Sequence, residues 1–302
     1  MRFVSAKELV LDAQRGGYAV PALNTNGGTY DIARAALEAA QAKQSPVILQ
    51  VYEPNTEYRG FRHFVELADG LCDELGVTVP VALQLDHGKS FESVVRAMHA
   101  GLTSVMFDAS HDPIEENVAK TARVLEVARP LGVSVEAEIG YVKGNEPKQE
   151  VQIGRIPAPE KPTIPPCKTE VEEAVQFASE TAVDMLAVSI GTTHGVYQRQ
   201  DAIDFELLKK LREAVEIPLV MHGTSGISLD DLAELSRLGM AKVNFGEPFR
   251  YNYIRYFNEL ADDMEHQWHA WRIMQEVKNR LRADMEELIE ALGATGKAAV
   301  LP

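Results

Sequence analysis

Three histidines of the sequence stand at or shortly after the end of an apolar segment, and each is followed by a glycine. They are His87, His194 and His222. A neutral imidazole is a common zinc ligand, and three protein ligands with an open fourth position are typical of a catalytic zinc site. A following glycine lets the backbone come close to a ligand. A single histidine of this kind is more often a hydrogen-bonded structural residue, but three in matching positions predict a metal centre.

Carboxylates also lie near the ends of apolar segments. Asp86 directly precedes His87, Asp108 follows the apolar run 103–107, and Glu138 lies near the end of another run, with Glu136 two positions before it. A buried strand would not carry such groups without partners. Asp108 and Glu138 could form a second, looser cation site, or they could orient the histidines. The sequence leaves both options open.

Short apolar segments alternate with amphipathic segments along the chain, and this alternation predicts eight strands, each followed by a helix. Alternating strands and helices favour a parallel sheet, and eight such units favour a closed (β/α)8 TIM barrel, in which the carboxyl ends of the strands meet at one face. An open doubly wound sheet is the alternative, but no GxGxxG follows the first strand, as a dinucleotide-binding version would require. The predicted strands are 18–24, 46–52, 79–86, 103–108, 133–139, 185–190, 218–222 and 241–245.

Three segments extend this regular pattern. A helix at 5–15, with the capping-box residues Ser5 and Glu8, is predicted before the first strand. The segment 140–168 holds six of the fifteen prolines and predicts a long, mobile inserted loop after the fifth strand. Residues 247–293 predict two C-terminal helices that part near 266–269 and include aromatic residues expected in packing and in a subunit interface. We expect a single domain over residues 1–302.

Composition and charge limit the class of protein. The chain is 45% hydrophobic and 25% charged, which is typical of a soluble globular enzyme. A net charge of −15 argues against nucleic acid or an anionic membrane as the main partner. Cys72 and Cys167 form no metal-binding spacing and are expected to be free thiols. Because the sequence has neither a signal-like N-terminus nor a long apolar run, we expect a cytoplasmic location.

Several segments, in order, closely resemble the class II (zinc-dependent) ketose-bisphosphate aldolases, which include fructose-1,6- and tagatose-1,6-bisphosphate aldolases. The resemblance runs from about Val4 to Leu292 and implies a (β/α)8 barrel that assembles into a homodimer or homotetramer. It also implies reversible retro-aldol cleavage of a ketose phosphate to dihydroxyacetone phosphate and an aldehyde, through a metal-stabilised enediolate. The segments that carry it are 85–88, 104–111, 135–140, 190–195, 220–226 and 242–244.

The resemblance also implies roles for individual residues. His87, His194 and His222 would hold one catalytic Zn²⁺, and Asp108 with Glu138 matches the position of a second divalent cation. Asp86 would be the acid and base on the aldehyde oxygen, and Glu146 in the segment 143–146 would remove the C3 proton. The candidate substrate contacts, with the strand-end residue Asn24 included, are Asn24, Gly195, Gly223, Thr224, Ser225, Asn244, Phe245, Gly246 and Glu247.

A Schiff-base mechanism is disfavoured by the positions of the lysines. None is obviously placed at the carboxyl end of a predicted strand, and Lys242 is expected at the beginning of the last strand, away from the site. A metal ion can stabilise the same negative charge as a Lewis acid. The residue types therefore agree with the metal-dependent chemistry that the resemblance implies.

Some positions depart from the family. Glu247 stands where the family usually has a threonine that grips phosphate, and Tyr52 stands where some members have serine. The proline-rich run 156–166 looks like an addition. These departures predict a substrate other than ordinary fructose-1,6-bisphosphate, which either lacks the C1 phosphate or is held through Arg250. In the alternative, Glu247 points into solvent or onto Arg250 and the phosphate site survives through the backbone.

Two other readings remain open at this point. The first is a metal-dependent sugar epimerase or lyase that does not cleave a carbon–carbon bond, and detection of a triose product separates it from an aldolase. The second is a catalytically silent barrel used for binding. Retention of Asp86 and all three histidines argues against a silent barrel.

Overall fold

The computed structural model describes residues 3–142, 158–163, 167–263 and 269–298. Within these residues, eight parallel strands close into a barrel, because β1 pairs with both β2 and β8. The predicted (β/α)8 fold is therefore confirmed, and the open doubly wound sheet is excluded. The strands are β1 (Val20–Asn24), β2 (Val47–Tyr52), β3 (Val81–Gly88), β4 (Ser104–Phe107), β5 (Ser134–Ile139), β6 (Met185–Val188), β7 (Leu219–Met221) and β8 (Met240–Phe245).

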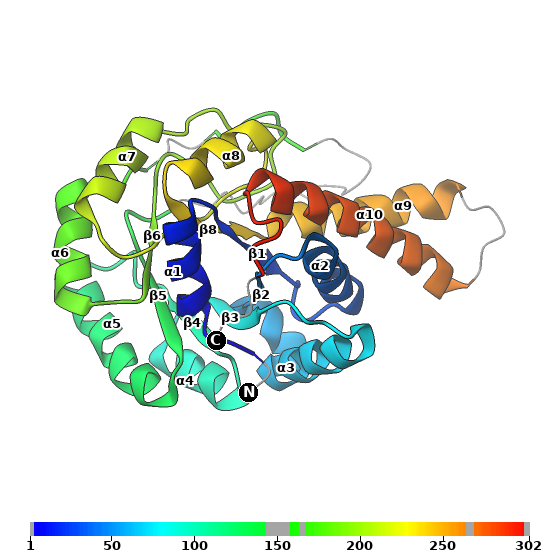
Figure 1. The fold of residues 1–302 in the computed structure, drawn as a ribbon, viewed down its shortest axis with the longest axis horizontal. Coiled ribbons are helices and arrows are strands. Elements are labelled where there is room, and N and C mark those ends of the chain that lie inside the picture. Colours follow the sequence, from blue (N-terminus) through cyan, green and yellow to red (C-terminus); the bar gives the residue numbers. More distant parts are fainter. Residues whose placement is uncertain (1–2, 143–157, 164–166, 264–268, 299–302) are drawn as a thin grey trace.

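Helices surround the barrel, as Figure 1 shows. One of them, α1, precedes β1, as the sequence predicts for the N-terminal extension. Two short 3-10 helices, η1 (Glu53–Asn55) and η2 (Arg129–Leu131), flank longer helices. The α-helices are α1 (Ala6–Gly16), α2 (Tyr30–Lys43), α3 (Thr56–Leu75), α4 (Phe91–Ala100), α5 (Ile114–Ala128), α6 (Val171–Thr181), α7 (Phe205–Ala214), α8 (Leu229–Arg237), α9 (Glu247–Asp263) and α10 (Ala270–Ala291).

One local prediction differs from the structure at a helix start, and one helix is kinked. Ser5 lies at the N-cap position of α1, but its side chain makes no capping hydrogen bond, so the predicted capping box is wrong. Helix α3 begins at Thr56 and is kinked at Gly60, where φ is 79°. Glycine adopts such a φ without a steric penalty, so Gly60 allows the change of direction between the two helical pieces.

The interior of the barrel holds a layer of polar side chains below the strand ends. Gln50, Gln84, Glu136 and Lys242 are all buried. Lys242 lies in the middle of β8, so the expectation that it begins the last strand is wrong. Its Nζ donates to Glu136 Oε2 over 2.7 Å, and Gln84 Nε2 donates to the same oxygen over 2.7 Å. A buried charge persists in a protein when it is paired and hydrogen-bonded in this way.

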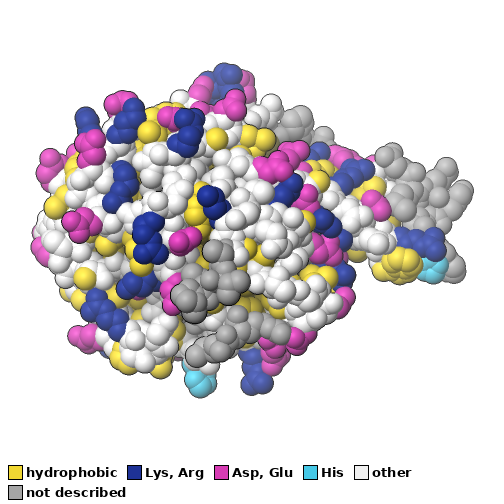
Figure 2. Space-filling view, viewed as in Figure 1, with side chains coloured by type: hydrophobic (Ala, Val, Ile, Leu, Met, Phe, Trp, Pro, Cys, Tyr) yellow, Lys and Arg dark blue, Asp and Glu magenta, His cyan; other side chains and the backbone are white. Residues whose placement is uncertain are grey.

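Helices α9 and α10 confirm the predicted C-terminal extension. They run side by side and project from the barrel as an arm (Figure 1), which Figure 2 shows as a protrusion from the body. The part of α10 nearer the barrel packs against α2, and its apolar face is buried through Val277, Leu281, Met285 and Ile289. Among the described helices, none is both long and apolar enough to cross a bilayer.

Candidate metal centre and active site

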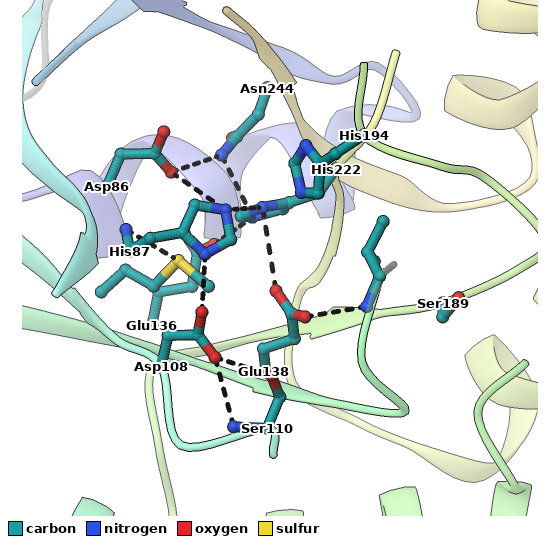
Figure 3. A network of polar contacts seen from close by, with 12 residues as sticks. Asp86, His87, Asp108, Ser110, Glu136, Glu138, Ser189, His194, His222 and Asn244 are labelled. Atoms are coloured by element: carbon teal, nitrogen blue, oxygen red, sulfur yellow. Dashed lines mark hydrogen bonds and ion pairs between the residues drawn. The ribbon is translucent and has the colours of Figure 1, made fainter. Parts of the chain in front are cut away.

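The three predicted histidines converge at the carboxyl ends of the strands (Figure 3). The ring centroid of His87 lies 4.9 Å from that of His222 and 5.2 Å from that of His194, and the remaining pair is 5.8 Å apart. One nitrogen from each ring can be chosen so that the three lie within 4.8 Å of one another. This spacing brings three imidazole donors around one point, as a catalytic metal site requires.

A local irregularity of β3 allows both Asp86 and His87 to serve this site. Adjacent residues of a regular strand point to opposite faces. Here the pairing of β3 with β4 shifts between Leu85 and Gly88, and His87 has a φ of 51°. A bulge of this kind re-aims a side chain at the end of a strand. The left-handed backbone of His87 therefore turns its ring toward the other histidines.

Two of the histidines have a carboxylate on the ring nitrogen that faces away from the cluster. His87 Nδ1 lies 2.8 Å from Asp108 Oδ2, and His222 Nε2 lies 2.8 Å from Glu136 Oε1. Their remaining nitrogens, His87 Nε2 and His222 Nδ1, face each other at 3.1 Å. A carboxylate that accepts the N–H of an imidazole fixes its tautomer and leaves the other nitrogen free to bind a metal.

His194 follows the same pattern from a different part of the fold. Its Nδ1 lies 3.1 Å from Glu247 Oε1. Its Nε2 is buried and has no hydrogen-bond partner among the residues that the structure describes. A buried polar atom without a partner costs free energy. A metal ion between the three rings would use this nitrogen, so the donor set fits the metal that the sequence predicts.

Asp108 and Glu138, with His87, form a second group whose ligand atoms lie within 4.8 Å. The carboxylate of Asp108 is already hydrogen-bonded, however. It accepts from Lys89 Nζ over 2.5 Å and from Ser110 Oγ over 2.6 Å, in addition to His87. Burial would raise the pKa of Asp108, but His87 and Lys89 hold it well below its usual range. Asp108 therefore stays ionised and is largely engaged by the protein.

Two further carboxylates near the histidines, those of Glu136 and Glu247, are also held as anions. Burial would raise the pKa of Glu136, but Lys242 and His222 lower it to about 2. Burial would likewise raise the pKa of Glu247, and His194 with Arg250 lowers it to about 2. An anion beside each of these imidazoles stabilises the positive charge that a bound cation would bring.

Asp86 is oriented by two asparagine side chains. Asn24 Nδ2 donates to Asp86 Oδ2 over 3.1 Å, and Asn244 Nδ2 donates to Asp86 Oδ1 over 3.3 Å. Oδ1 lies 3.9 Å from His87 Nε2. The predicted substrate residues Asn24 and Asn244 therefore hold the predicted acid and base in place beside the cluster.

The other predicted substrate contacts lie around the same mouth. Thr224 Oγ1 donates to Asn244 O over 2.6 Å, and Ser225 Oγ accepts from Tyr197 N over 3.1 Å, so both hydroxyls have protein partners. At Gly223 (φ 70°), an added Cβ would lie 2.9 Å from the backbone of Thr193. Only glycine allows this close approach.

Three further candidates differ in what they offer. The side chain of Phe245 belongs to the hydrophobic core, so only its backbone is free to face a ligand. Gly246 lies beside Asn24, and Gly195 directly follows His194.

Glu146, the predicted C3 base, lies outside the described residues. Of the proline-rich run, 158–163 are described. Pro159 O and Glu160 O accept from backbone N–H groups in the loop that follows His194.

Two lysines were missed as members of the site. Lys242 neutralises Glu136, and Lys89 neutralises Asp108. A lysine within the apolar run 240–245 was a usable signal, because a charged residue in a buried strand must be paired. Lys89, two positions after His87, gave no comparable signal, since it directly follows the strand, where a solvated lysine is ordinary.

The chain is similar to several known proteins. Residues 4–297 match the family described as "Fructose-bisphosphate aldolase class-II". The chain is 38% identical to a fructose-bisphosphate aldolase of Geobacillus stearothermophilus, over 99% of this chain and all of that protein. It is 37% identical to the 6-phospho-5-dehydro-2-deoxy-D-gluconate aldolase of Bacillus subtilis, over 99% of this chain and 98% of that protein. The crystal structure of the YdjI aldolase from Escherichia coli K12 superposes with a TM-score of 0.82 at 28% identity, covering 98% and 100% of the two chains.

Proposed function

This chain belongs to the class-II fructose-bisphosphate aldolase family and is an aldolase, and we propose that it cleaves a ketose phosphate at a zinc site formed by His87, His194 and His222. The single observation that carries this assignment is the convergence of three imidazoles, each with a carboxylate on its outer nitrogen. His87 and His194 would bind through Nε2 and His222 through Nδ1. When bound, zinc supplies Lewis-acid stabilisation of the negative charge that develops on the ketone half of the substrate.

Asp86 is the proposed proton carrier at the aldehyde oxygen. During cleavage the C3–C4 bond breaks, the C4 hydroxyl proton passes to Asp86, and the electron pair stays on C3. During condensation Asp86 returns the proton to the same oxygen. The two asparagine amides support this role, because they hold the carboxylate beside the histidines without neutralising it. We assign Glu146 to proton exchange at C3, following the resemblance of the segment 143–146.

We assign one catalytic ion to each chain. The alternative of a second cation at Asp108 and Glu138 is disfavoured, because the ammonium of Lys89 lies 2.5 Å from Asp108 and already supplies a positive charge there. His87 also belongs to both ligand groups. Its Nδ1 is engaged by Asp108, so only its Nε2 remains for a metal.

The choice of sugar rests on residues at the mouth of the barrel rather than on overall similarity. Identity to the fructose-bisphosphate aldolase and to the 6-phospho-5-dehydro-2-deoxy-D-gluconate aldolase differs by one percentage point, so similarity does not choose between them. Of the two orientations in the alternative reading, Glu247 does not point into solvent but does lie near Arg250, 3.8 Å away. Its carboxylate, at the start of α9, also faces His194. A carboxylate there disfavours a phosphate at the same helix end, and this supports a ketose phosphate other than fructose-1,6-bisphosphate.

A product assay with matched substrates tests the function. The zinc-loaded chain is given fructose-1,6-bisphosphate, tagatose-1,6-bisphosphate, a ketose 1-phosphate and the unphosphorylated ketoses, and release of dihydroxyacetone phosphate or free dihydroxyacetone is measured. Asp86→Asn is the control, with an expected loss of about 10²- to 10⁴-fold in kcat and retained zinc. Epimerised sugar without any triose would contradict the aldolase assignment. If fructose-1,6-bisphosphate is the best substrate, only the proposal of a different ketose phosphate is contradicted.

We also propose a homodimer or homotetramer in a reducing, cytoplasmic compartment. Ile254 and Phe257 on α9 and Trp271 on α10 are exposed, with Trp271 61% accessible, and this supports an interface on the projecting arm. Cys72 and Cys167 form no disulfide in the part of the chain that the structure describes, as expected in a reducing compartment. Light scattering of the purified chain gives its mass in solution, and a monomer would contradict the assembly.

A further inference from the structure

We propose that Glu247 is the positioning residue of the third metal ligand: it accepts the Nδ1–H of His194 and so aims Nε2 at the metal. The inference rests on the zinc site proposed above and adds a residue to it. It concerns the contact between the loop after β6, which carries His194, and the first residue of α9.

The contact has the geometry that this role requires. Glu247 Oε1 lies 3.1 Å from His194 Nδ1, and the two side chains are only 16% and 22% exposed. The opposite ring nitrogen, Nε2, is buried and has no partner within the described part of the chain. Because Glu247 holds one nitrogen, the unpartnered one is the nitrogen left to face the other two histidines.

His194 has more need of such a partner than the other two ligands. His87 lies within β3, and His222 directly follows β7, so the barrel itself fixes their backbones. His194 lies six positions beyond Val188, the last residue of β6. A loop backbone fixes a side chain less firmly than a strand does. Tyr197 and Gln200 hold the backbone of this loop, and the carboxylate on α9 adds a restraint on the ring itself.

The role also sets the tautomer of the ring. A neutral imidazole carries its proton on one nitrogen only, and the hydrogen bond on the other side decides which. With Glu247 as acceptor, the proton stays on Nδ1 and Nε2 keeps a lone pair for a metal. Without an acceptor, the ring can rotate or carry the proton on Nε2, where it cannot bind a cation. Loss of such a partner typically weakens metal affinity about 10- to 100-fold.

Three variants separate positioning from other effects. Glu247→Ala removes the acceptor, and Glu247→Gln keeps an oxygen that can accept the Nδ1–H but removes the charge. Glu259→Gln is the matched control on the same helix, where the carboxylate binds Arg255 and Arg280 away from the histidines. Zinc affinity is measured by competition with a chelator, and the thermal unfolding of each metal-free variant shows whether it is folded.

We expect Glu247→Ala to bind zinc about 10- to 100-fold more weakly than the unaltered chain. Glu247→Gln should recover most of that loss, and Glu259→Gln should bind normally. In ¹⁵N-histidine spectra of the zinc-loaded protein, the unaltered chain should show His87 and His194 bound through Nε2 and His222 through Nδ1. The Nδ1–H signal of His194 should broaden or disappear in Glu247→Ala.

Two results would overturn the role of Glu247. The first is zinc affinity and a His194 signal that are unchanged in Glu247→Ala. The second is a zinc affinity of Glu247→Gln that is as low as that of Glu247→Ala. In that case Glu247 acts through its charge alone and does not position the ring. If Glu247→Ala does not fold, the nearly isosteric Glu247→Gln and the ¹⁵N spectrum still decide. Failure of the unaltered chain to bind zinc at the three histidines would instead overturn the metal site itself.

Discussion

The histidine cluster has two halves that are anchored in different ways. In the strand-anchored half, ligands and carboxylates come from barrel strands or the residues next to them. In the helix-anchored half, the ligand lies in a loop and its carboxylate begins α9, the first helix of the projecting arm (Figure 1). The strand-anchored half comprises His87, His222, Asp108 and Glu136, and the helix-anchored half comprises His194 and Glu247.

The two halves also differ in the cation that pairs with the carboxylate. Lys242 lies 2.7 Å from Glu136, and both side chains are completely buried. Arg250 lies 3.8 Å from Glu247 and is 40% exposed. Removing one partner of a buried charge pair leaves the other charge buried and uncompensated, whereas water screens the charges of an exposed pair. The barrel strands therefore fix one half of the site, while the other half depends on how a helix end meets a loop.

The largest effect is expected from breaking the buried pair of the strand-anchored half. Lys242→Met leaves Glu136 buried and without its cation, and loss of one partner of a buried pair typically costs about 3–5 kcal/mol in the free energy of unfolding. Chemical denaturation of the metal-free protein measures this cost. Lys242→Met with Glu136→Gln should restore much of the stability. A single variant as stable as the unaltered chain would show that the barrel does not depend on this charge pair.

The next largest effect is expected from a change of pH, which alters zinc affinity through His87 in the strand-anchored half. Burial would lower the pKa of His87, but Asp86 and the neighbouring carboxylates raise it to about 9 in the metal-free protein. A metal ligand must be unprotonated, so zinc affinity should rise by up to about tenfold per pH unit as the pH approaches 9, and then level off. Zinc titrations between pH 6 and 10, corrected for the competing chelator, measure this slope. Constant affinity below pH 9 would contradict it.

The same pKa gives a stability change with a defined sign. Because the pKa of His87 is raised above its unfolded value of 6.5, the protonated ring stabilises the metal-free fold fully below about pH 6.5, and this contribution is lost as the pH rises through about 9. Zinc-loaded protein should lack this decline, since the ring is then unprotonated throughout. Thermal unfolding of both forms across this range provides the check.

The smallest effect is expected at the exposed cation of the helix-anchored half. Arg250→Gln should change the free energy of unfolding by no more than about 1 kcal/mol, because an exposed ion pair contributes roughly 0–1 kcal/mol. Its zinc affinity should stay close to that of the unaltered chain. Chemical denaturation and chelator competition, carried out on Arg250→Gln and Lys242→Met under the same conditions, compare the two variants directly. A loss as large as that of Lys242→Met would mean that both halves depend equally on their cations.

Much of this arrangement was accessible from the sequence. The alternation of apolar and amphipathic segments fixed the order of strands and helices, and the strand-end positions of His87, His194 and His222 followed from it. Asp86 and Asp108 were found in the same way. These features are local, because a residue's distance along the chain from the end of its strand sets its place at the barrel mouth. The capping box at Ser5 and the place of Lys242 in its strand were wrong, since both depend on local geometry that the pattern does not specify.

The amino-acid sequence by itself determined a barrel with three histidines and several carboxylates at one end. Only the tertiary structure decided which carboxylate pairs with which ring and which nitrogen faces inward. Lys242 and Glu136 are 106 positions apart, and His222 and His87 are 135 apart. Pairing over such separations depends on how the closed barrel sets its strands in register and on the bulge at His87. No local pattern encodes it, because each pair forms only when the whole barrel has closed.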